Sequence, residues 1–357
     1  MIMDTVSNIK IERTQHSTID QVDFENIKFG KQFSDHVFIA DYKNGEWTDL
    51  RIEPYAPMAL SPACAAIHYG QAIFEGMKAY KNEDGDIFLF RPEDNARRIN
   101  KSAHRLCMPE IPESLFMEAL TKLIEVDSEW VPAIDGCSLY IRPFMFASEE
   151  LLGVRPADEY RFMIFTAPVN AYYGEPVDVK IETEFSRATE GGVGFAKAAG
   201  NYAAALYPAK LGQDKGYKQL IWTDSAEHKY IEESGTMNIM FHIGDTLVTP
   251  NLDFKTTLAG ITRDSALTLA KELGIKVEER RVSVAEVIEA AQNGTLKDVF
   301  GTGTAATIAQ VASITHEGTR YELPAVESRI LSNELDQLLQ DIKRGRVEDK
   351  HNWIYKI

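Results

Sequence analysis

Apolar and polar residues mix along the first half of the chain in the way that half-buried β-strands require. Residues 36–42 and 47–52 are strand candidates on either side of a Lys-Asn-Gly-Glu turn, so they predict a β-hairpin. A second turn, at residues 82–86, separates two more strand candidates, residues 76–80 and 87–90. The N-terminal half is therefore expected to be rich in strands joined by tight turns, after a lead-in with one short strand.

Elsewhere the apolar residues recur every three to four positions, which is the period of an amphipathic helix. Helices are expected at about residues 92–106, 113–130, 202–210, 262–274 and 325–344. Further strands are expected at residues 138–146, 162–168, 177–185 and 219–223, in a hairpin over residues 236–249, and in a strand–helix–strand run that ends in a Gly-Thr-Gly-Thr loop at residues 301–304. This mixture predicts an α/β or mixed α+β fold.

The length of 357 residues is enough for roughly two domains with cores of their own. Residues 171–176 are rich in turn-forming residues and join two strand candidates, so they are predicted to be the interdomain linker. We expect a smaller N-terminal domain over residues 1–170 and a larger C-terminal domain over residues 177–357.

The composition narrows the class of protein. A net charge of −16 argues against nucleic acid or an anionic membrane as a partner. Three widely spaced cysteines favour reduced thiols over a disulfide framework or a zinc site. No apolar stretch has the length of a membrane span, and the first 21 residues lack the apolar core of a signal peptide. We therefore expect a cytoplasmic protein.

One lysine stands out among the residues that could carry chemistry. Lys197 follows a glycine-dense segment, residues 191–196, and precedes an alanine-rich helix candidate that Asn201 and Tyr202 open. Small residues on both sides leave room for a flat group against the amine, and a desolvated lysine is a nucleophile toward carbonyl compounds. The ordinary alternative is a solvated surface lysine, so other parts of the chain must support the assignment.

Four other features gain meaning if Lys197 is reactive. Glu233 comes before a small turn and could pair with a protonated ring nitrogen, although a solvated loop carboxylate is the simpler reading. Residues 258–263 lead into a predicted helix. Its N-terminus could bind a phosphate, or Thr262 could simply cap the helix. Residues 301–306 could cradle an anion with backbone N–H groups. Either Arg97 or Arg98 could reach a phosphate, or both could be solvated.

Rival chemistries lack their motifs. The glycine run before Lys197 has neither the spacing nor the Gly-Lys-Ser/Thr ending of a nucleotide-binding P-loop, because Ala196 and Ala198 flank the lysine. The eight histidines and three cysteines form no His-x-x-x-His or Cys-x-x-Cys pair, so no metal site is predicted. The chain also has no Gly-x-Ser-x-Gly elbow.

The order of these motifs resembles a known family. The C-terminal half contains, in sequence, Lys197, Asn201-Tyr202, Glu-Ser-Gly-Thr-Met-Asn at 233–238, Gly-Ile-Thr-Arg at 260–263 and Gly-Thr-Ala at 303–305. The N-terminal half contains Phe-Gly-Lys at 29–31, His-Tyr-Gly-Gln at 68–71, Phe-Glu-Gly-Met-Lys-Ala at 74–79, Arg98, Tyr-Ile-Arg-Pro at 140–143 and Leu-Gly-Val at 152–154. Together they resemble the fold-type IV pyridoxal-phosphate enzymes, specifically the branched-chain amino acid aminotransferases of the larger, eukaryotic-like type.

The resemblance implies pyridoxal 5'-phosphate as the cofactor and assigns residues to it. Lys197 would hold the cofactor covalently and later shuttle a proton, Tyr202 would hydrogen-bond the ring oxygen, and Glu233 would keep the pyridine nitrogen protonated. The phosphate would be bound by Arg98, Ile261, Thr262 and Thr304.

The resemblance also implies a substrate pocket and a homodimer. Apolar walls for a branched side chain would come from Phe29, Tyr69 and Phe74. The substrate carboxylate would bind Tyr140, Thr304 and Ala305, and Arg142 would receive the distal carboxylate of glutamate. Since burying an unpaired arginine is costly, we expect an internal hydrogen-bond partner for Arg142 in the free enzyme. Leu152 and Val154 would reach the site from the second subunit.

The function implied by the resemblance is amino-group exchange between L-leucine, L-isoleucine or L-valine and 2-oxoglutarate. D-Amino acid aminotransferase and aminodeoxychorismate lyase are alternatives of similar fold, and a non-catalytic relative is an alternative of another class. Ala306 and Ala309 stand where mammalian members carry Cys-x-x-Cys, so redox control of that kind is not expected. Ala198 and Ala199 stand where those members have Met-Gly.

Overall fold

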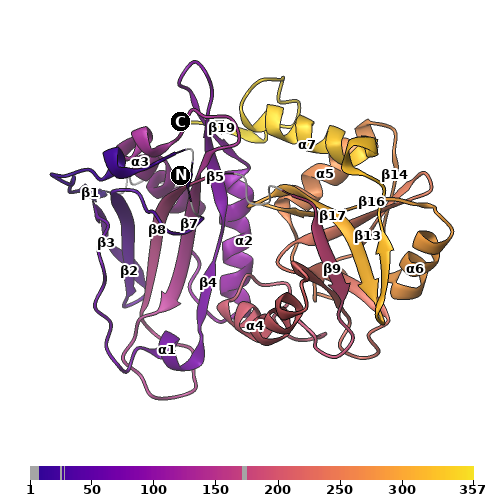
Figure 1. Cartoon of the computed structure of the whole chain (residues 1–357). Coiled ribbons are helices and arrows are strands. Elements are labelled where there is room, and N and C mark those ends of the chain that lie inside the picture. The colour runs from indigo at the N-terminus through magenta and orange to yellow at the C-terminus, as the bar shows by residue number, and fades with distance from the viewer. Residues whose placement is uncertain (1–7, 25, 28, 171–174) are drawn as a thin grey trace, which may run out of the picture. The chain divides into compact units, whose positions relative to one another are not determined.

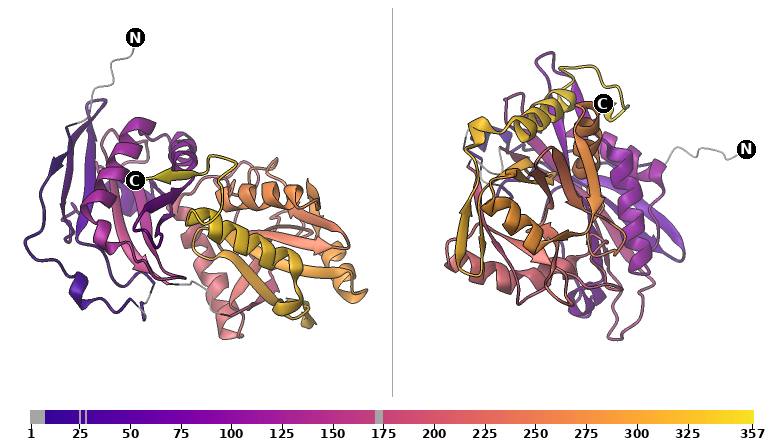
Figure 2. Two further views of the ribbon diagram at one scale, coloured as in Figure 1. Left: turned by 90° about the horizontal axis from the view of Figure 1, so that it is seen from above. Right: turned by 90° about the vertical axis from the view of Figure 1, so that its right-hand side faces the viewer.

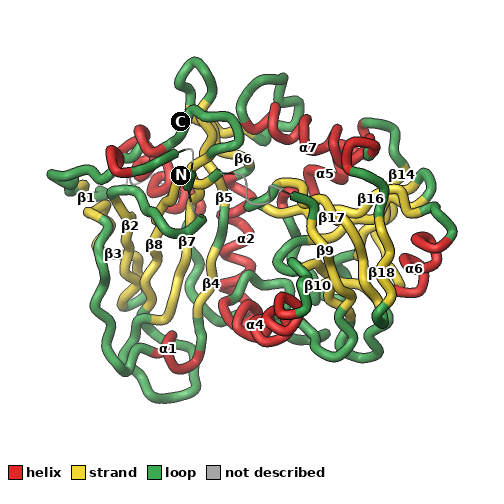
Figure 3. Tube along the Cα trace, in the orientation of Figure 1, coloured by secondary structure: helices red, strands yellow, loops and turns green. Residues whose placement is uncertain are grey.

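The computed structural model describes residues 8–24, 26–27, 29–170 and 175–357 (Figure 1). Its contacts divide the chain into two compact units. Unit 1 consists of Met1–Tyr172, Ala196–Ala199 and Ile342–Ile357, and unit 2 of Tyr173–Phe195 and Gly200–Asp341. Both units mix helices and strands (Figure 3), which confirms the mixed α/β class.

The predicted linker lies largely outside the described residues, since 171–174 belong to the part that is not described, and it stays a prediction. Two segments differ from the predicted linear division. The short segment with Lys197 and the segment 342–357 were expected in the C-terminal domain, yet their contacts are with unit 1. Strand pairing is the reason, because Ala198 forms a bridge with Ile73 and the segment 354–356 joins the first sheet.

Unit 1 is built on a nine-stranded sheet in the order β1-β3-β2-β8-β7-β5-β6-β19, with β4 paired to β7. Its strands are β1 (Lys10–Ile11), β2 (His36–Lys43), β3 (Glu46–Pro54), β4 (Ala72–Phe74), β5 (Met77–Lys81), β6 (Ile87–Phe90), β7 (Ser138–Ala147), β8 (Tyr160–Val169) and β19 (Ile354–Lys356). All the pairings are antiparallel except β1 with β3. Both predicted hairpins are confirmed, as β2–β3 and β5–β6.

The helices of unit 1 are α1 (Ala65–Tyr69), α2 (Pro92–Arg105) and α3 (Glu113–Val126). The apolar stripe of α3 is fully buried and joins the sheet core, where the ring of Phe116 stacks on Phe162 of β8 at 5.9 Å between centroids. The predicted helix 113–130 ends at Val126, and a short 3₁₀ turn, Ser128–Trp130, follows it. The yellow strand β19 lies beside the purple β6 in Figure 2, so residues distant in sequence complete this sheet.

Unit 2 is built on a ten-stranded sheet in the order β14-β13-β12-β16-β17-β9-β10-β11-β15, with β18 paired to β17. Its strands are β9 (Val177–Ile181), β10 (Gln219–Thr223), β11 (Tyr230–Ser234), β12 (Asn238–Ile243), β13 (Thr246–Pro250), β14 (Lys276–Arg280), β15 (Val282–Ser283), β16 (Leu296–Gly303), β17 (Thr307–His316) and β18 (Thr319–Glu322). This sheet is mixed: β9 pairs in parallel with β10 and with β17, whereas β12, for example, pairs antiparallel with β13 and β16.

Four helices lie wholly or mostly in unit 2: α4 (Ala199–Asp214), α5 (Ile261–Glu272), α6 (Val284–Gln292) and α7 (Ile330–Lys343). Helix α4 is longer at both ends than predicted, and α7 begins five residues later than predicted, after the 3₁₀ turn Val326–Ser328. Among the described residues, no helix combines the length and apolar character that crossing a bilayer requires.

The Gly-Thr-Gly-Thr sequence was predicted to be a loop, and that prediction is wrong for residues 301–303, which end strand β16. The glycines serve close packing there. A Cβ on Gly301 would lie 2.9 Å from the Met237 Cε, and one on Gly303 would lie 3.2 Å from its Cγ. The Met237 side chain therefore covers the strand where side chains are missing, and the loop starts only at Thr304.

Candidate active site

Lys197 is held by its backbone within unit 1. Its N–H donates to the Ser102 Oγ at 2.9 Å, and its carbonyl accepts the Phe74 N–H at 3.1 Å. The flanking Ala196 and Ala198 are buried, while Lys197 itself is half-buried. Its Nζ lies 4.9 Å from the centre of the Phe74 ring. The lysine is thus fixed between β4 and α2 and is not a freely solvated surface residue.

The glycines before Lys197 have a packing role that the sequence did not reveal. A Cβ on Gly194 would lie 2.5 Å from the Thr256 carbonyl oxygen and 2.6 Å from the Ala188 Cβ, both in unit 2. This close approach requires glycine at position 194. The small residues around Lys197 were predicted to leave room for a flat group, and at Gly194 the space is filled by the protein itself.

A buried ion pair lies beside Lys197. The carboxylate of Glu75 is fully buried and accepts the Arg98 Nε at 2.7 Å and the Arg98 Nη2 at 2.8 Å. It also accepts Asn95 Nδ2 at 2.8 Å and the Gly76 N–H at 3.2 Å. Asn95 and Arg98 are one turn apart on α2, so one helix face supplies three of the four donors.

The charge of Glu75 is maintained despite its burial. Desolvation alone would raise the pKa of this carboxyl, but the Arg98 charge and hydrogen bonds and the charge of Lys197 outweigh it and lower the pKa below its ordinary value. Sequence reasoning placed Glu75 in a family motif but gave it no role. The spacing of Asn95, Arg98 and Ser102 along α2 was the available signal.

The expected internal partner of Arg142 is Tyr140. The Arg142 Nη2 donates to the Tyr140 hydroxyl at 2.8 Å, and its guanidinium carbon lies 4.6 Å from the Phe74 ring centre. Phe29 meets the Tyr140 ring edge-on at 5.4 Å. The Arg142 Nε is buried without a hydrogen-bond partner among the described residues. The Arg142 cation therefore lies against two aromatic rings, Phe74 and Tyr140, and Phe29 packs on the second of them.

The structure does not bring the remaining predicted substrate residues of unit 1 into this cluster. Tyr69 ends helix α1 and is 41% exposed, whereas Leu152 and Val154 are 71% and 91% exposed in the segment that follows β7. Ile67, also on α1, is 61% exposed. Apolar side chains are thus left open to solvent on unit 1.

Glu233 is paired within unit 2. It is 3% exposed on β11, its Oε2 lies 3.0 Å from the Arg187 Nε, and its Oε1 accepts the Leu258 N–H at 2.7 Å. Arg187 also donates to the carbonyl oxygens of Gly194 and Thr256. The nearby guanidinium and the amide together fix the position of this carboxylate. Sequence reasoning missed Arg187, which lies 46 positions before its partner and belongs to no motif.

The start of α5 has the form predicted for a phosphate site. Gly260 precedes the helix, and no side chain caps it. A Cβ on Gly260 would lie 1.9 Å from the Asn238 Oδ1, so only glycine fits, while the Asn238 Nδ2 donates to the Leu258 carbonyl at 2.9 Å. Ile261 and Thr262 open the helix with their backbone N–H groups at its positive end.

The other predicted residues of unit 2 are half-buried. Tyr202 lies in the first turn of α4, which starts at Ala199 and not at Tyr202, and Thr304 and Ala305 lie in the turn between β16 and β17. Within the described ranges, no group of three His, Cys, Asp or Glu residues could hold a metal ion.

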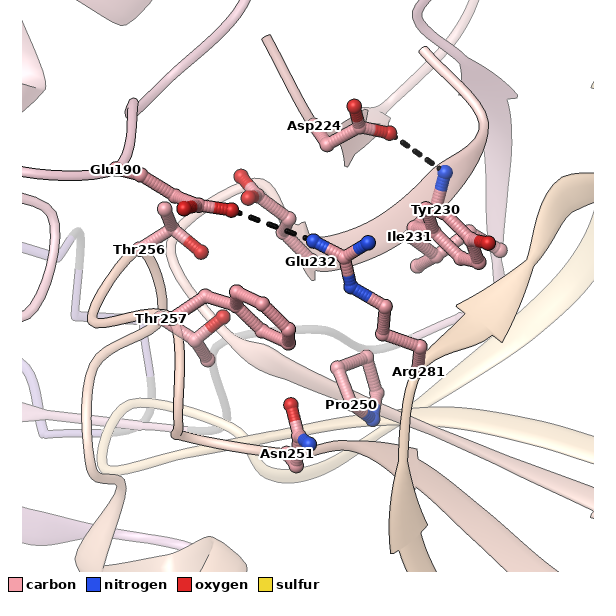
Figure 4. A pocket seen from close by; sticks show the side chains of 11 residues that line it. Glu190, Asp224, Tyr230, Ile231, Glu232, Pro250, Asn251, Thr256, Thr257 and Arg281 are labelled. Carbon is pink, nitrogen blue, oxygen red and sulfur yellow. Dashed lines mark hydrogen bonds and ion pairs between the residues drawn. The ribbon is translucent and has the colours of Figure 1, made fainter. Parts of the chain in front are cut away.

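A small pocket lies on unit 2 near Glu233 (Figure 4). Glu232, the neighbour of Glu233 on β11, lines it with a buried Oε2 that has no hydrogen-bond partner in the described part of the chain. Burial is the largest cause of the raised pKa of Glu232. Arg281 covers the pocket, since it stacks at 3.8 Å on the Phe254 ring and pairs with Glu190 at 3.3 Å.

The residues present fit pyridoxal phosphate by their chemistry. Unit 1 offers an amine, Lys197, beside the buried guanidinium of Arg98. Unit 2 offers a buried, ion-paired carboxylate, Glu233, and a helix N-terminus with a glycine at its start. An amine, a carboxylate and an anion-binding helix end are the three groups that a phosphorylated pyridine aldehyde needs.

Comparisons with known proteins agree with this chemistry. The family model described as "Amino-transferase class IV" matches residues 72–314. Branched-chain-amino-acid transaminase 1 of Bacillus subtilis is 44% identical over 343 residues, covering 95% of this chain and 96% of that protein. Branched-chain-amino-acid aminotransferase 2 of the same organism is 42% identical over 357 residues, covering 99% and 98%.

Solved structures show the same fold. The crystal structure of the Escherichia coli branched-chain amino acid aminotransferase superposes with a TM-score of 0.73 at 27% identity, over 90% of this chain and 98% of that one. The branched-chain amino acid aminotransferase of Thermobaculum terrenum, in its PLP-bound holo form, has a TM-score of 0.72 at 22% identity, over 91% and 99%.

Proposed function

The chain belongs to the class IV aminotransferase family, and from this premise we propose that it is a branched-chain-amino-acid transaminase dependent on pyridoxal 5'-phosphate. It exchanges the amino group between L-leucine, L-isoleucine or L-valine and 2-oxoglutarate. Relatives 42–44% identical over nearly the whole chain support this substrate class. D-Amino acid aminotransferase and aminodeoxychorismate lyase activity have no comparable support.

The cluster of Phe74, Tyr140 and Arg142 is the observation that carries this assignment. A transaminase of this kind must accept a branched apolar side chain and then a second carboxylate in one pocket. Aromatic faces suit the first substrate and a guanidinium suits the second. Arg142 is partly satisfied by Tyr140 at 2.8 Å, which limits the cost of keeping it buried while the apolar substrate is bound.

Bound pyridoxal phosphate supplies an electron sink that stabilises negative charge at the substrate Cα. Lys197 would hold the cofactor covalently, and its amine would take and return the proton at the substrate Cα. Glu233 would hold a proton at the pyridine nitrogen, and Tyr202 would donate a hydrogen bond to the ring oxygen. The phosphate would be bound by Arg98, the N–H groups of Ile261 and Thr262, and Thr304.

The substrate is held by a second set of residues, which shares Thr304 with the phosphate site. The Tyr140 hydroxyl and the N–H groups of Thr304 and Ala305 bind its α-carboxylate. Phe29 and Phe74 form apolar walls, and Tyr69 is proposed to complete them although it lies outside the Arg142 cluster in this subunit. Arg142 binds the distal carboxylate of glutamate, for which bidentate pairing is the preferred geometry.

We also propose a homodimer in the cytoplasm. Leu152 and Val154 are more than two-thirds exposed, and such apolar side chains are more stable when a second subunit covers them. In the dimer they reach the partner's substrate pocket. All three cysteines are free, as expected for a reducing compartment. Light scattering of the purified protein measures the mass, and a monomer at working concentration contradicts the dimer.

One assay tests the function. Purified protein with pyridoxal phosphate, L-leucine and 2-oxoglutarate should form L-glutamate, and borohydride should fix the cofactor on Lys197, as peptide mass spectrometry detects. Lys197→Ala should abolish turnover, whereas Lys210→Ala, an exposed lysine paired with Asp214, should retain it. Turnover of D-alanine without turnover of L-leucine would refute the assignment, and so would full activity of Lys197→Ala.

A further inference from the structure

We propose that Glu75 is a positioning residue of the reaction: it fixes the guanidinium of Arg98 and supplies the negative charge that balances the amine of Lys197. The inference deepens the proposed function, on which it rests, because it concerns the residues that would hold the cofactor. Glu75 itself contacts neither substrate nor cofactor in this scheme. It acts through Arg98 and Lys197.

The geometry of the ion pair supports a positioning role. Nε and Nη2 of Arg98 bind the two different carboxylate oxygens of Glu75, at 2.7 and 2.8 Å. A bidentate pair of this kind fixes the plane of the guanidinium as well as its location. A guanidinium has five donors, and this pair uses two of them, at its Nε edge.

Glu75 is in turn held from three directions. Its backbone N–H donates to the Pro143 carbonyl at 2.7 Å, next to Arg142 in β7. Asn95 binds the same carboxylate oxygen as the Arg98 Nη2, and the Gly76 N–H approaches it too. The side chain is 0% exposed. Four donors bind this carboxylate and water does not reach it, so its orientation toward Arg98 is fixed.

The same helix links this pair to the lysine. Ser102 donates to the Arg98 carbonyl at 3.2 Å and accepts the Lys197 N–H at 2.9 Å. One turn of α2 therefore carries both the guanidinium and the anchor of the lysine backbone. A shift of Arg98 would shift Ser102, and with it Lys197.

The charges require an anion at this place. Arg98 is 8% exposed and always charged, and the Lys197 amine lies within electrostatic reach of the same carboxylate. Without Glu75, the buried charge of Arg98 would lose the carboxylate that pairs with it. The charges of Arg98 and Lys197 both favour the ionised form of Glu75, so the carboxylate is coupled to both cations. An amide at position 75 would keep the shape and lose the charge.

The test compares Glu75→Gln and Glu75→Asp with a matched control, Asp127→Asn. Asp127 is also a buried carboxylate of unit 1, and its partner is His36, at 2.6 Å. The main readout is the pH midpoint at which the visible absorption of the bound cofactor changes. We expect Glu75→Gln to lower this midpoint by about one unit or more, and Asp127→Asn to leave it unchanged while lowering the melting temperature.

Glu75→Asp separates position from charge. It retains the anion but is one methylene shorter, so it cannot form the same bidentate pair. We expect its midpoint to stay near that of the wild type and its cofactor dissociation constant to rise about tenfold. If Glu75→Gln does not fold, Glu75→Asp still tests the proposal, because wild-type cofactor affinity in Glu75→Asp would overturn the positioning role.

A third readout uses the apoprotein. The rate at which Lys197 reacts with a water-soluble aldehyde and borohydride, measured by peptide mass spectrometry against pH, reports the charge on its amine. Its profile should move to lower pH in Glu75→Gln. An unchanged profile together with an unchanged cofactor midpoint would show that Glu75 is only structural. Failure of the wild type to bind the cofactor would instead refute the proposed function, while the apoprotein profile would still test Glu75.

Discussion

Gly76→Ala should damage the substrate site through one steric contact. A Cβ at this position would lie 2.2 Å from the Tyr140 hydroxyl oxygen and 3.0 Å from the Cζ that carries it. Carbon and oxygen atoms do not approach this closely, so the hydroxyl must move by about 1 Å. The backbone of Gly76 is not in the left-handed region, so alanine fits it without strain and the effect is purely that of the side chain.

The magnitude follows from what the displaced hydroxyl loses. Its hydrogen bond with Arg142, at 2.8 Å, involves a charged donor, and such bonds contribute about 1.5–3 kcal/mol. A loss of about 2 kcal/mol lowers the melting temperature by about 4–8 °C for a unit of this size. Because Tyr140 is proposed to bind the substrate carboxylate, a displacement of about 1 Å should lower kcat/KM for L-leucine about a hundredfold.

A double-mutant cycle tests the reasoning. Tyr140→Phe removes the oxygen that clashes, so Gly76→Ala should cost much less in that background than in the wild type, as thermal unfolding measures. Gly200→Ala is the matched control, because a Cβ at Gly200 meets nothing within 4 Å and its melting temperature should not fall. If the effects of Gly76→Ala and Tyr140→Phe on the melting temperature are simply additive, the steric explanation is refuted.

Three further changes test other parts of the structure. Asp127→Ala should cost about 3 kcal/mol, because it leaves the buried ring of His36 without its acceptor; a melting temperature within 2 °C of the wild type contradicts this. Burial raises the pKa of Glu232, so the folded state resists its ionisation, and wild-type stability falls relative to Glu232→Gln as the pH rises above the ordinary value of 4.5. At pH 8 the glutamine variant should be about 1–3 kcal/mol more stable in denaturant unfolding and at pH 3 no more stable, and the opposite order contradicts the argument. Arg187→Ala should leave the carboxylate of Glu233 buried without its cation and lower the free energy of unfolding by about 3–5 kcal/mol. Calorimetry measures this loss, and an unchanged stability would show that water replaces the guanidinium.

Much of the secondary structure could be predicted because local chemistry determines it. The turn around Gly45 and the turn around Gly85 have positive φ, and both hairpins form as the sequence indicates. Helix α1 and strand β4 are five and three residues long, too short to show a period, and neither was predicted. The end of strand β16 was predicted to be a loop, because its glycines have no side chains that could show the apolar–polar alternation of a strand.

The site was predictable only where residues belong to motifs. Lys197 and Glu233 were proposed from such patterns, and both prove to be held in place by hydrogen bonds. Their ionic neighbours were not predicted. Glu75 meets Arg98 across 23 positions and Arg187 meets Glu233 across 46, and nothing in the local sequence shows which distant charges fold together. The partner of a buried charge depends on tertiary packing, which a single sequence does not display.

The return of β19 to the first sheet affects how the protein can fold during synthesis. Strand β6 is synthesised early, whereas its neighbour β19 consists of residues 354–356. The edge of β6 therefore keeps unpaired N–H and C=O groups until that late segment leaves the ribosome. The segment with Lys197 also arrives long after the strand it bridges. Unit 1 therefore cannot complete its folding until the whole of unit 2 has been synthesised. During that interval the open edge of β6 is where another nascent chain could add a strand.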